Sequence, residues 1–243
     1  MHWFGLTDGL LWIDIGAQTI YEYNEEAQNY FGSSGKYNDY QISRFLEDFF
    51  VTFRYVGESI PVELYDCIDE FDSKTEKWKE CHIDEEDESY DRIYFEEYCE
   101  LYEWRSDRSF DSGHLVGGPY IGCFRCGEKI KILWESTFEL DNGNSIWTAP
   151  KGSYEMAYDD FVFAVTEFLE AFFVAMDKQV EHAVSKEWGS VSLDKQRLIK
   201  ENDERKSEFL QDISFLKHSW GNTDWNKVMM LYSKMQDEIK EML

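Results

Sequence analysis

The chain begins with a cluster of residues that could hold a ligand. The run "HWFGLTDGLLWIDI", which starts at His2, brings tryptophan, histidine and aspartate close together in sequence. Aromatic rings cover apolar ligands, and carboxylates and imidazoles bind or transfer protons, so these residue types could build a binding or catalytic site. One predicted ligand site, the N-terminal face, therefore consists of Trp3, Trp12 and Asp14, joined by His114 from a later glycine-rich turn.

The same run also fits a β-hairpin that needs no ligand. Pairing Thr7 with Leu10 makes a two-residue turn of the intervening Asp-Gly dipeptide, which tolerates the positive φ angles of such turns. In this register Gly5 lies opposite Trp12, whose indole covers the bare glycine backbone. We therefore expect packing, more than chemistry, to explain the tryptophans.

Other signatures of catalysis or metal binding are missing or incomplete. The sequence has no G-x-S-x-G, no H-E-x-x-H and no glycine-rich phosphate loop between a strand and a helix. Cys123 and Cys126 in "CFRCG" match one half of a zinc site, but no second C-x-x-C pair accompanies them. The expectation is a protein that is not an enzyme and has no cofactor, with structural zinc at these two cysteines as the alternative.

The charge of the chain points to a partner. The sequence has a net charge of −26, and the stretch from Glu63 to Glu103 alone holds 17 acidic and 4 basic residues. We call residues 63–104, which also contain many aromatic side chains, the acidic segment. Such a charge repels nucleic acid and anionic membranes and speeds encounter with a basic protein. We therefore expect a basic protein partner, no direct nucleic-acid binding and no membrane contact.

The middle of the acidic segment combines charge with aromatic anchors of the kind found at binding hot spots. Carried on a helix, these side chains could imitate the phosphates of a nucleic acid and block a basic cleft. The predicted partner-binding residues are Asp84, Glu85, Glu86, Asp87, Glu88, Tyr90, Asp91 and Tyr94.

The predicted function follows from this charge. It is that of a non-enzymatic immunity or inhibitor protein that neutralises a basic toxin or nucleic-acid-binding factor. One alternative is a small-ligand-binding or enzymatic domain that uses the N-terminal face. Another is a scaffold subunit of a bacterial defence assembly, docked through its C-terminal helices.

The elements that position these residues are strands first and helices later. The spacing predicts a hairpin of residues 120–124 and 129–134, a long amphipathic helix over 161–184 and two further helices, over 193–217 and from Trp225 onward. We predict an α+β fold, with antiparallel meander sheets packed by the long amphipathic helix and a C-terminal helical hairpin. Residues 1–188 form the predicted core domain and residues 189–243 a helical extension.

The compartment is predicted from absent signals. No run of about 18 apolar residues is present, and no basic region leads into an apolar stretch near Met1. Five cysteines are an odd number in a chain large enough to fold without disulfides, so we expect reduced thiols. These features predict a cytoplasmic protein.

Three quoted stretches resemble a known family. "HWFGLTDGLLWIDIG", "GHLVGGPYIGCFRCGEKIKILWE" and "IWTAPKGSYEMAYDDFVFAVTEFLEAFFVAM" are similar to a bacterial family of uncharacterised domains with an H-W-F-G-L-T-D-G opening, a G-P-x-I turn and a W-T-A-P segment before a long helix. The resemblance leaves out the acidic segment and the last two predicted helices. It implies a small bacterial or phage cytosolic protein, brings no established reaction, and therefore assigns no catalytic residues.

Overall fold

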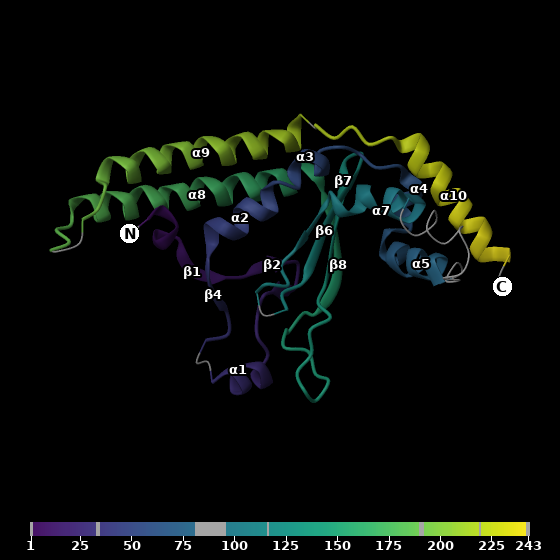
Figure 1. Ribbon diagram of the computed structural model, residues 1–243, viewed down its shortest axis with the longest axis horizontal. Coiled ribbons are helices and arrows are strands. Elements are labelled where there is room, and N and C mark those ends of the chain that lie inside the picture. Colours follow the sequence, from purple (N-terminus) through teal and green to yellow (C-terminus); the bar gives the residue numbers. More distant parts are fainter. Residues whose placement is uncertain are drawn as a thin grey trace.

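A four-stranded antiparallel sheet lies at the centre of the molecule (Figure 1). The computed structural model describes residues 2–32, 35–80, 96–115, 117–189, 192–218 and 220–241. Helices flank the sheet on both sides, and the predicted α+β class is confirmed. The strands, in the spatial order β5-β6-β7-β8, are Ser109–Asp111, Tyr120–Cys126, Lys129–Glu135 and Lys151–Ala157.

The predicted hairpin is present as β6 and β7. Gly127 supplies the positive φ that its turn requires. Strand β8, which the sequence pattern did not reveal, pairs with β7 along its whole length. Side chains of β6 alternate between the two faces of the sheet, so Cys123 belongs to one hydrophobic core and Phe124 to the other. The sheet therefore separates two cores.

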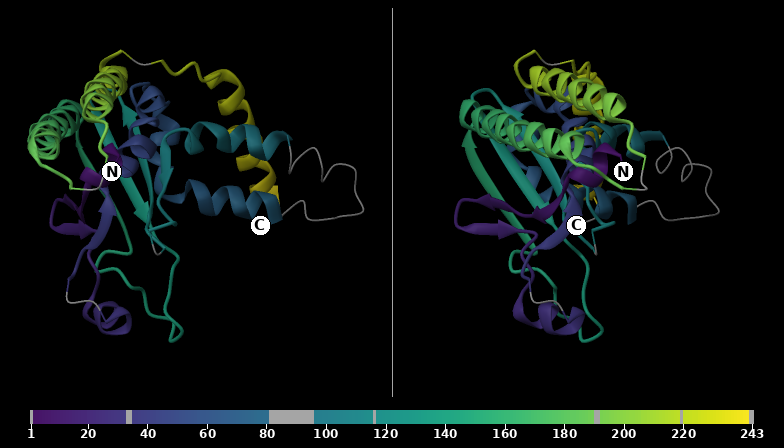
Figure 2. Two further views of the ribbon diagram at one scale, coloured as in Figure 1. Left: turned by 60° about the vertical axis from the view of Figure 1, so that its left-hand side comes forward. Right: turned by 90° about the vertical axis from the view of Figure 1, so that its left-hand side faces the viewer.

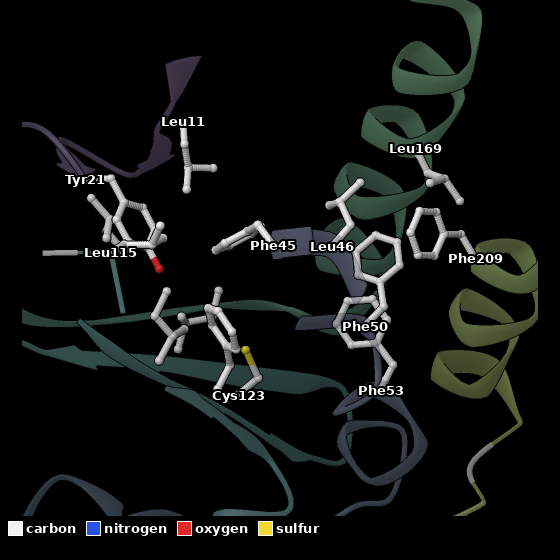
Figure 3. Packing of buried hydrophobic residues seen from close by; sticks show 14 of the residues in the cluster. Leu11, Tyr21, Phe45, Leu46, Phe50, Phe53, Leu115, Cys123, Leu169 and Phe209 are labelled. Carbon is white, nitrogen blue, oxygen red and sulfur yellow. The ribbon is translucent and has the colours of Figure 1, made fainter. Parts of the chain in front are cut away.

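The first core joins the N-terminal elements to two long helices. Helices α8 (Tyr158–Ser185) and α9 (Lys195–Lys217) lie side by side as a helical hairpin, and both contact the short 3-10 helix η1 (Trp3–Leu6). Figure 3 shows side chains from β1, α2, β6, α8 and α9 packed together in this core. The remaining helices on this side are α2 (Ile42–Phe50) and α3 (Phe53–Val56).

The second core lies on the opposite face of the sheet. Helix α10 (Trp225–Glu241) packs on α5 (Ile68–Glu80) and α7 (Cys99–Ser106), as Figure 2 shows. Helix α4 (Val62–Asp66) completes this side. Among the described helices, none has the length and apolar character that crossing a membrane requires.

The predicted N-terminal hairpin is wrong. Residues Trp3–Leu6 form η1, so Gly5 does not pair with Trp12. The strand that follows, β1 (Asp8–Leu11), pairs instead with β4 (Asn38–Gln41). The hairpin that does form joins β2 (Ile13–Ile15) to β3 (Gln18–Ile20), with the turn at Gly16. Burial of Trp3 against distant helices outweighs the local turn preference of Asp-Gly. Helix α1 (Glu25–Phe31) lies between β3 and β4.

Candidate functional site

A cleft of about 820 Å³ opens between the second core and the sheet. One wall comes from α5 and α7, and the other from the ends of β5 to β8 with the segments beside them. The volume lies in the range of about 300–1,000 Å³ that is usual for binding sites. We call it the acidic cleft; its charged lining residues are Asp69, Asp72, Arg105, Asp111, Glu135, Glu139 and Lys151.

The helical wall is positioned by its apolar side. Helix α5 buries Ile68, Phe71 and Trp78 in the second core, at spacings that define one helix face. Its carboxylates at Asp69 and Asp72 consequently lie along the edge of that face and line the cleft. This wall belongs to the acidic segment identified from the sequence.

Arg105 shows how the cleft holds a guanidinium group. Its side chain is buried, and both Nε and Nη2 donate to the carboxylate of Asp72. The guanidinium also lies 5.4 Å from the ring centroid of Tyr120 and 5.9 Å from that of Tyr102. Bidentate pairing and ring contacts are the two means by which proteins bind arginine.

The two tyrosines keep their protons. Burial is the main cause that raises the pKa of Tyr102 and of Tyr120 above the ordinary value. Both phenols therefore present hydroxyl groups to the cleft at neutral pH, not phenolates. The described lining residues include no histidine and no cysteine, and their polar groups are hydroxyls, carboxylates and two cations.

Negative charge exceeds positive charge around the cleft. Five carboxylates and two cations line it among the described residues. Asp72 pairs with Arg105, Asp69 accepts from Lys131 Nζ at 2.7 Å, and Glu135 accepts from Lys151 Nζ at 2.8 Å. In the part of the chain that the structure describes, Asp111 and Glu139 form no ion pair, which leaves two carboxylates available to an incoming cation.

The predicted partner-binding residues, from Asp84 to Tyr94, lie outside the described residues. The chain on either side of them is anchored to the second core. Tyr98 Oη donates to Glu76 Oε1 at 2.6 Å, and the Lys79 ammonium lies 5.4 Å from the Tyr98 ring centroid. The large aromatic residues at 78 and 104 are buried core side chains, not exposed anchors.

The structure divides the predicted N-terminal face. Trp12 is 44% exposed, and its Nε1 donates to Asp14 Oδ2 at 3.3 Å, so these two residues do meet. Trp3 is fully buried and therefore belongs to the core, not to an exposed face. His114 contacts Tyr40, a residue of β4: its Nε2 lies 3.0 Å from the phenol oxygen of Tyr40.

The two candidate zinc ligands point away from each other. Cys123 and Cys126 are three residues apart within strand β6, which places their backbones about 10 Å apart. Cys123 packs in the first core and Cys126 against the second, so their thiols lie on opposite faces of the sheet. Within the described residues, no group of three or more His, Cys, Asp or Glu could hold a metal ion.

A family match extends over nearly the whole chain. The family described as "Family of unknown function (DUF5984)" matches residues 1–231. The chain belongs to this family. The match includes the acidic segment and α9 and ends within the first half of α10, so it reaches further than the stretches quoted from the sequence. No curated protein and no solved structure matches the chain.

The motifs that carry the family resemblance meet in space and hold the fold together. Trp147, in the W-T-A-P segment, donates from Nε1 to the carbonyl oxygen of Gly117 at 2.9 Å. Its ring stacks on Tyr23 at 4.8 Å between centroids. Gly118 of the G-P-x-I turn lies so close to the Ser112 carbonyl that an added Cβ would be 2.6 Å from that oxygen. These motif residues therefore form a packed junction.

None of the described residues that line the acidic cleft was predicted as a partner-binding residue from the sequence. The helical wall lies within the acidic segment, but the sheet wall, with Asp111, Glu135 and Glu139, was missed. These three residues are separated in sequence and belong to different strands and connections. Their spacing in the sequence gives no signal that would bring them together.

Proposed function

We propose that the protein is a binding protein for a basic protein, acting as an immunity or inhibitor protein, and that the acidic cleft receives arginine or lysine side chains of the partner. The observation that supports this most directly is the excess of carboxylates around the cleft. Asp111 and Glu139 are the lining carboxylates that form no ion pair within the described part of the chain. They are the natural counter-ions for an incoming side chain.

Charge and aromatic rings have separate contributions to such binding. The net charge of −26 draws a basic partner in from a distance, and this attraction weakens as salt rises. Within the cleft, Tyr102, Tyr120 and the exposed ring of Phe138 offer faces for a guanidinium group. Arg105 already occupies one such place, paired with Asp72 and in contact with two of these rings.

The test is a pull-down that separates local charge from total charge. The full chain is used as bait against a lysate of the native host at about 50 mM and about 500 mM salt, a range over which exposed charges become screened. The cleft variant carries Glu135→Lys and Glu139→Lys. The control variant carries Glu170→Lys and Glu181→Lys, two exposed positions on α8 across the sheet, and has the same net charge.

We expect wild type and the α8 control to capture the same basic protein at low salt and the cleft variant to lose it. Binding of that purified protein should then weaken with rising salt. Equal loss in both variants would mean that total charge, not the cleft, governs capture. Absence of any basic protein at low salt would contradict the proposed function.

A further inference from the structure

A second cavity, of about 700 Å³, lies on the other face of the sheet. It is bounded by α8 on one side, by β1 and β2 on the other, and by α2, β6 and β7 at its floor. Leu11, Phe45 and Cys123, which Figure 3 shows pointing toward one another from β1, α2 and β6, belong to its walls. The space is open to solvent along α8, where Ala164, Phe168 and Ala171 are exposed, and its volume lies in the range of about 300–1,000 Å³ that is usual for ligand sites.

Helix α8 has a separate apolar stripe for this cavity. Phe161, Val165, Phe168 and Phe172 line it at helical spacing, and Ala164 and Ala171 lie on the same stripe. A different stripe of α8 packs on α9, through residues such as Phe173, whose ring centroid lies 5.9 Å from that of Phe209. The two small alanines leave the room that larger side chains would fill.

The mouth of the cavity carries one fixed carboxylate. Asp14 is the only charged residue among the described lining residues. Its Oδ1 accepts from Thr19 Oγ1 at 2.8 Å and its Oδ2 from Trp12 Nε1 at 3.3 Å, so both oxygens are held in place. Trp12 and Tyr154 are partly exposed at the same mouth, whereas Phe45 and Phe50 at the floor are buried.

The walls of the cavity favour an apolar chain, whereas its mouth favours a polar head group. The apolar walls fit an aliphatic chain, because removing each of its methylene groups from water is favourable. Asp14 accepts hydrogen bonds and carries negative charge, and the whole chain is acidic at −26. An anionic head group would be repelled there, whereas an ammonium or hydroxyl group would donate to the carboxylate.

We propose that this cavity binds a single-chain amphiphile, with its aliphatic chain between α8 and the sheet and a head group that donates hydrogen bonds, preferably a cationic amine, at Asp14. The site lies across the sheet from the acidic cleft, and no described residue lines both of them. Binding of the amphiphile therefore does not depend on the proposed protein partner.

The test is a fluorescence titration of the full chain. N-phenyl-1-naphthylamine, a neutral probe that brightens in apolar sites, is titrated first. It is then displaced with dodecylamine, dodecanol or dodecanoate, each kept below its micelle concentration. We expect saturable binding of one probe per chain, with displacement strongest by the amine, intermediate by the alcohol and at least tenfold weaker by the carboxylate. The proposal would be overturned if the wild-type protein did not bind the probe saturably, or if dodecanoate displaced the probe as well as dodecylamine does.

Variants locate the site. Ala164→Trp and Ala171→Trp each place an indole in the cavity and should reduce probe binding at least tenfold. Ala175→Trp makes the same change at an exposed position of α8 outside the lining and should bind as wild type does. Two blocking variants are made so that the test still works if one of them does not fold. Circular dichroism checks the folding of each. Unchanged binding in a folded blocking variant would show that the probe lies elsewhere.

The head group is tested separately at Asp14. In Asp14→Asn the carboxylate is lost while the cavity walls remain, so dodecanol should displace the probe as before. Dodecylamine should lose its advantage over dodecanol. An amine preference that persists in this variant would contradict the assignment of Asp14.

Discussion

The indole Nε1 of Trp3 donates a hydrogen bond of 2.9 Å to Asn202 Oδ1, across 199 positions of the sequence. Both side chains are buried, and Asn202 Nδ2 donates in turn to Asp177 Oδ1 at 2.8 Å. One asparagine therefore ties η1 and both long helices together. The tryptophan of the H-W-F-G motif fixes the start of the chain to the helical hairpin, which explains its burial without any ligand.

Replacing this asparagine should destabilise the protein. Asn202→Leu leaves the Trp3 N–H buried without an acceptor, which costs about 1–3 kcal/mol of unfolding free energy. The measurement is urea unfolding followed by circular dichroism. Gln211→Leu, at an exposed position of the same helix, is the control and should change stability by less than about 0.5 kcal/mol. Equal stability of the two variants would show that the hydrogen bond contributes nothing.

A second prediction concerns the buried ion pair of Arg108 with Glu58. Arg108 is completely buried, and burial lowers the pKa of its guanidinium. Glu58 Oε2 accepts from Arg108 and also from Thr223 Oγ1 at 2.7 Å, while Glu58 Oε1 accepts from Trp225 Nε1 at 3.2 Å. The carboxylate therefore anchors the start of α10 to the second core.

Glu58→Gln should consequently cost about 3–5 kcal/mol of unfolding free energy, because it leaves a buried cation without its counter-ion. It should also speed protease cleavage before α10, at residues 218–224. Glu63→Gln, at an exposed glutamate of α4, is the matched control. A glutamine variant that resists both urea and protease like this control would show that the carboxylate charge is not needed.

Two glycines of the family motifs, Gly118 and Gly5, should respond differently to replacement by alanine. An added Cβ at Gly118 would lie 2.6 Å from the backbone oxygen of Ser112, so Gly118→Ala forces the backbone to move. We expect a loss of about 1–3 kcal/mol of unfolding free energy. At Gly5 an added Cβ meets nothing within 4 Å, and Gly5→Ala should be neutral or stabilising by up to about 1 kcal/mol. Thermal unfolding of both variants decides this, and similar melting temperatures would refute the steric explanation.

Local patterns predicted the elements whose partners are nearby. The β6–β7 hairpin, α8 and α10 follow from alternation or helical spacing within one segment. The prediction of an N-terminal hairpin was wrong because Trp3 is buried and bonded to Asn202 of α9. The polar composition of that stretch of α9 gives no sign that Asn202 is buried. Long-range pairing of this kind is invisible to periodicity.

The sequence did not predict the acidic cleft, and the reason is the same. Asp69 and Asp72 lie in a segment whose charge is evident, but the opposite wall is assembled from strand ends. Glu135 ends β7, and Glu139 follows it in a connection with no regular spacing. Only the fold brings these carboxylates to face α5. The apolar cavity likewise depends on Ala164 and Ala171 of α8. The sequence does not show that they line one cavity together with residues of β2.

The last prediction is a pH dependence at Cys123. This thiol is fully buried among apolar side chains, and burial raises its pKa from 9.0 to about 12. The unfolded chain releases the proton near pH 9, whereas the folded chain keeps it up to about pH 12. The unfolded state therefore binds fewer protons than the folded state between these values, so the contribution of Cys123 to stability is complete below pH 9 and declines above it.

Cys123→Ala removes this titration, so comparing the variant with wild type isolates the contribution of the thiol. The difference in unfolding free energy between wild type and Cys123→Ala should be constant from pH 7.5 to 8.5 and then fall by about 1.4 kcal/mol per pH unit, because one pKa unit corresponds to that energy. Urea unfolding at pH 8, 9, 10 and 10.5 measures it, and the other titrating groups cancel because both proteins contain them. Mass spectrometry after iodoacetamide treatment provides a second readout: Cys123 should react in urea and stay unmodified in the folded protein at pH 8.5. A difference that does not change with pH, or rapid alkylation of folded Cys123, would show that the thiol is open to solvent and that the floor of the apolar cavity is wet.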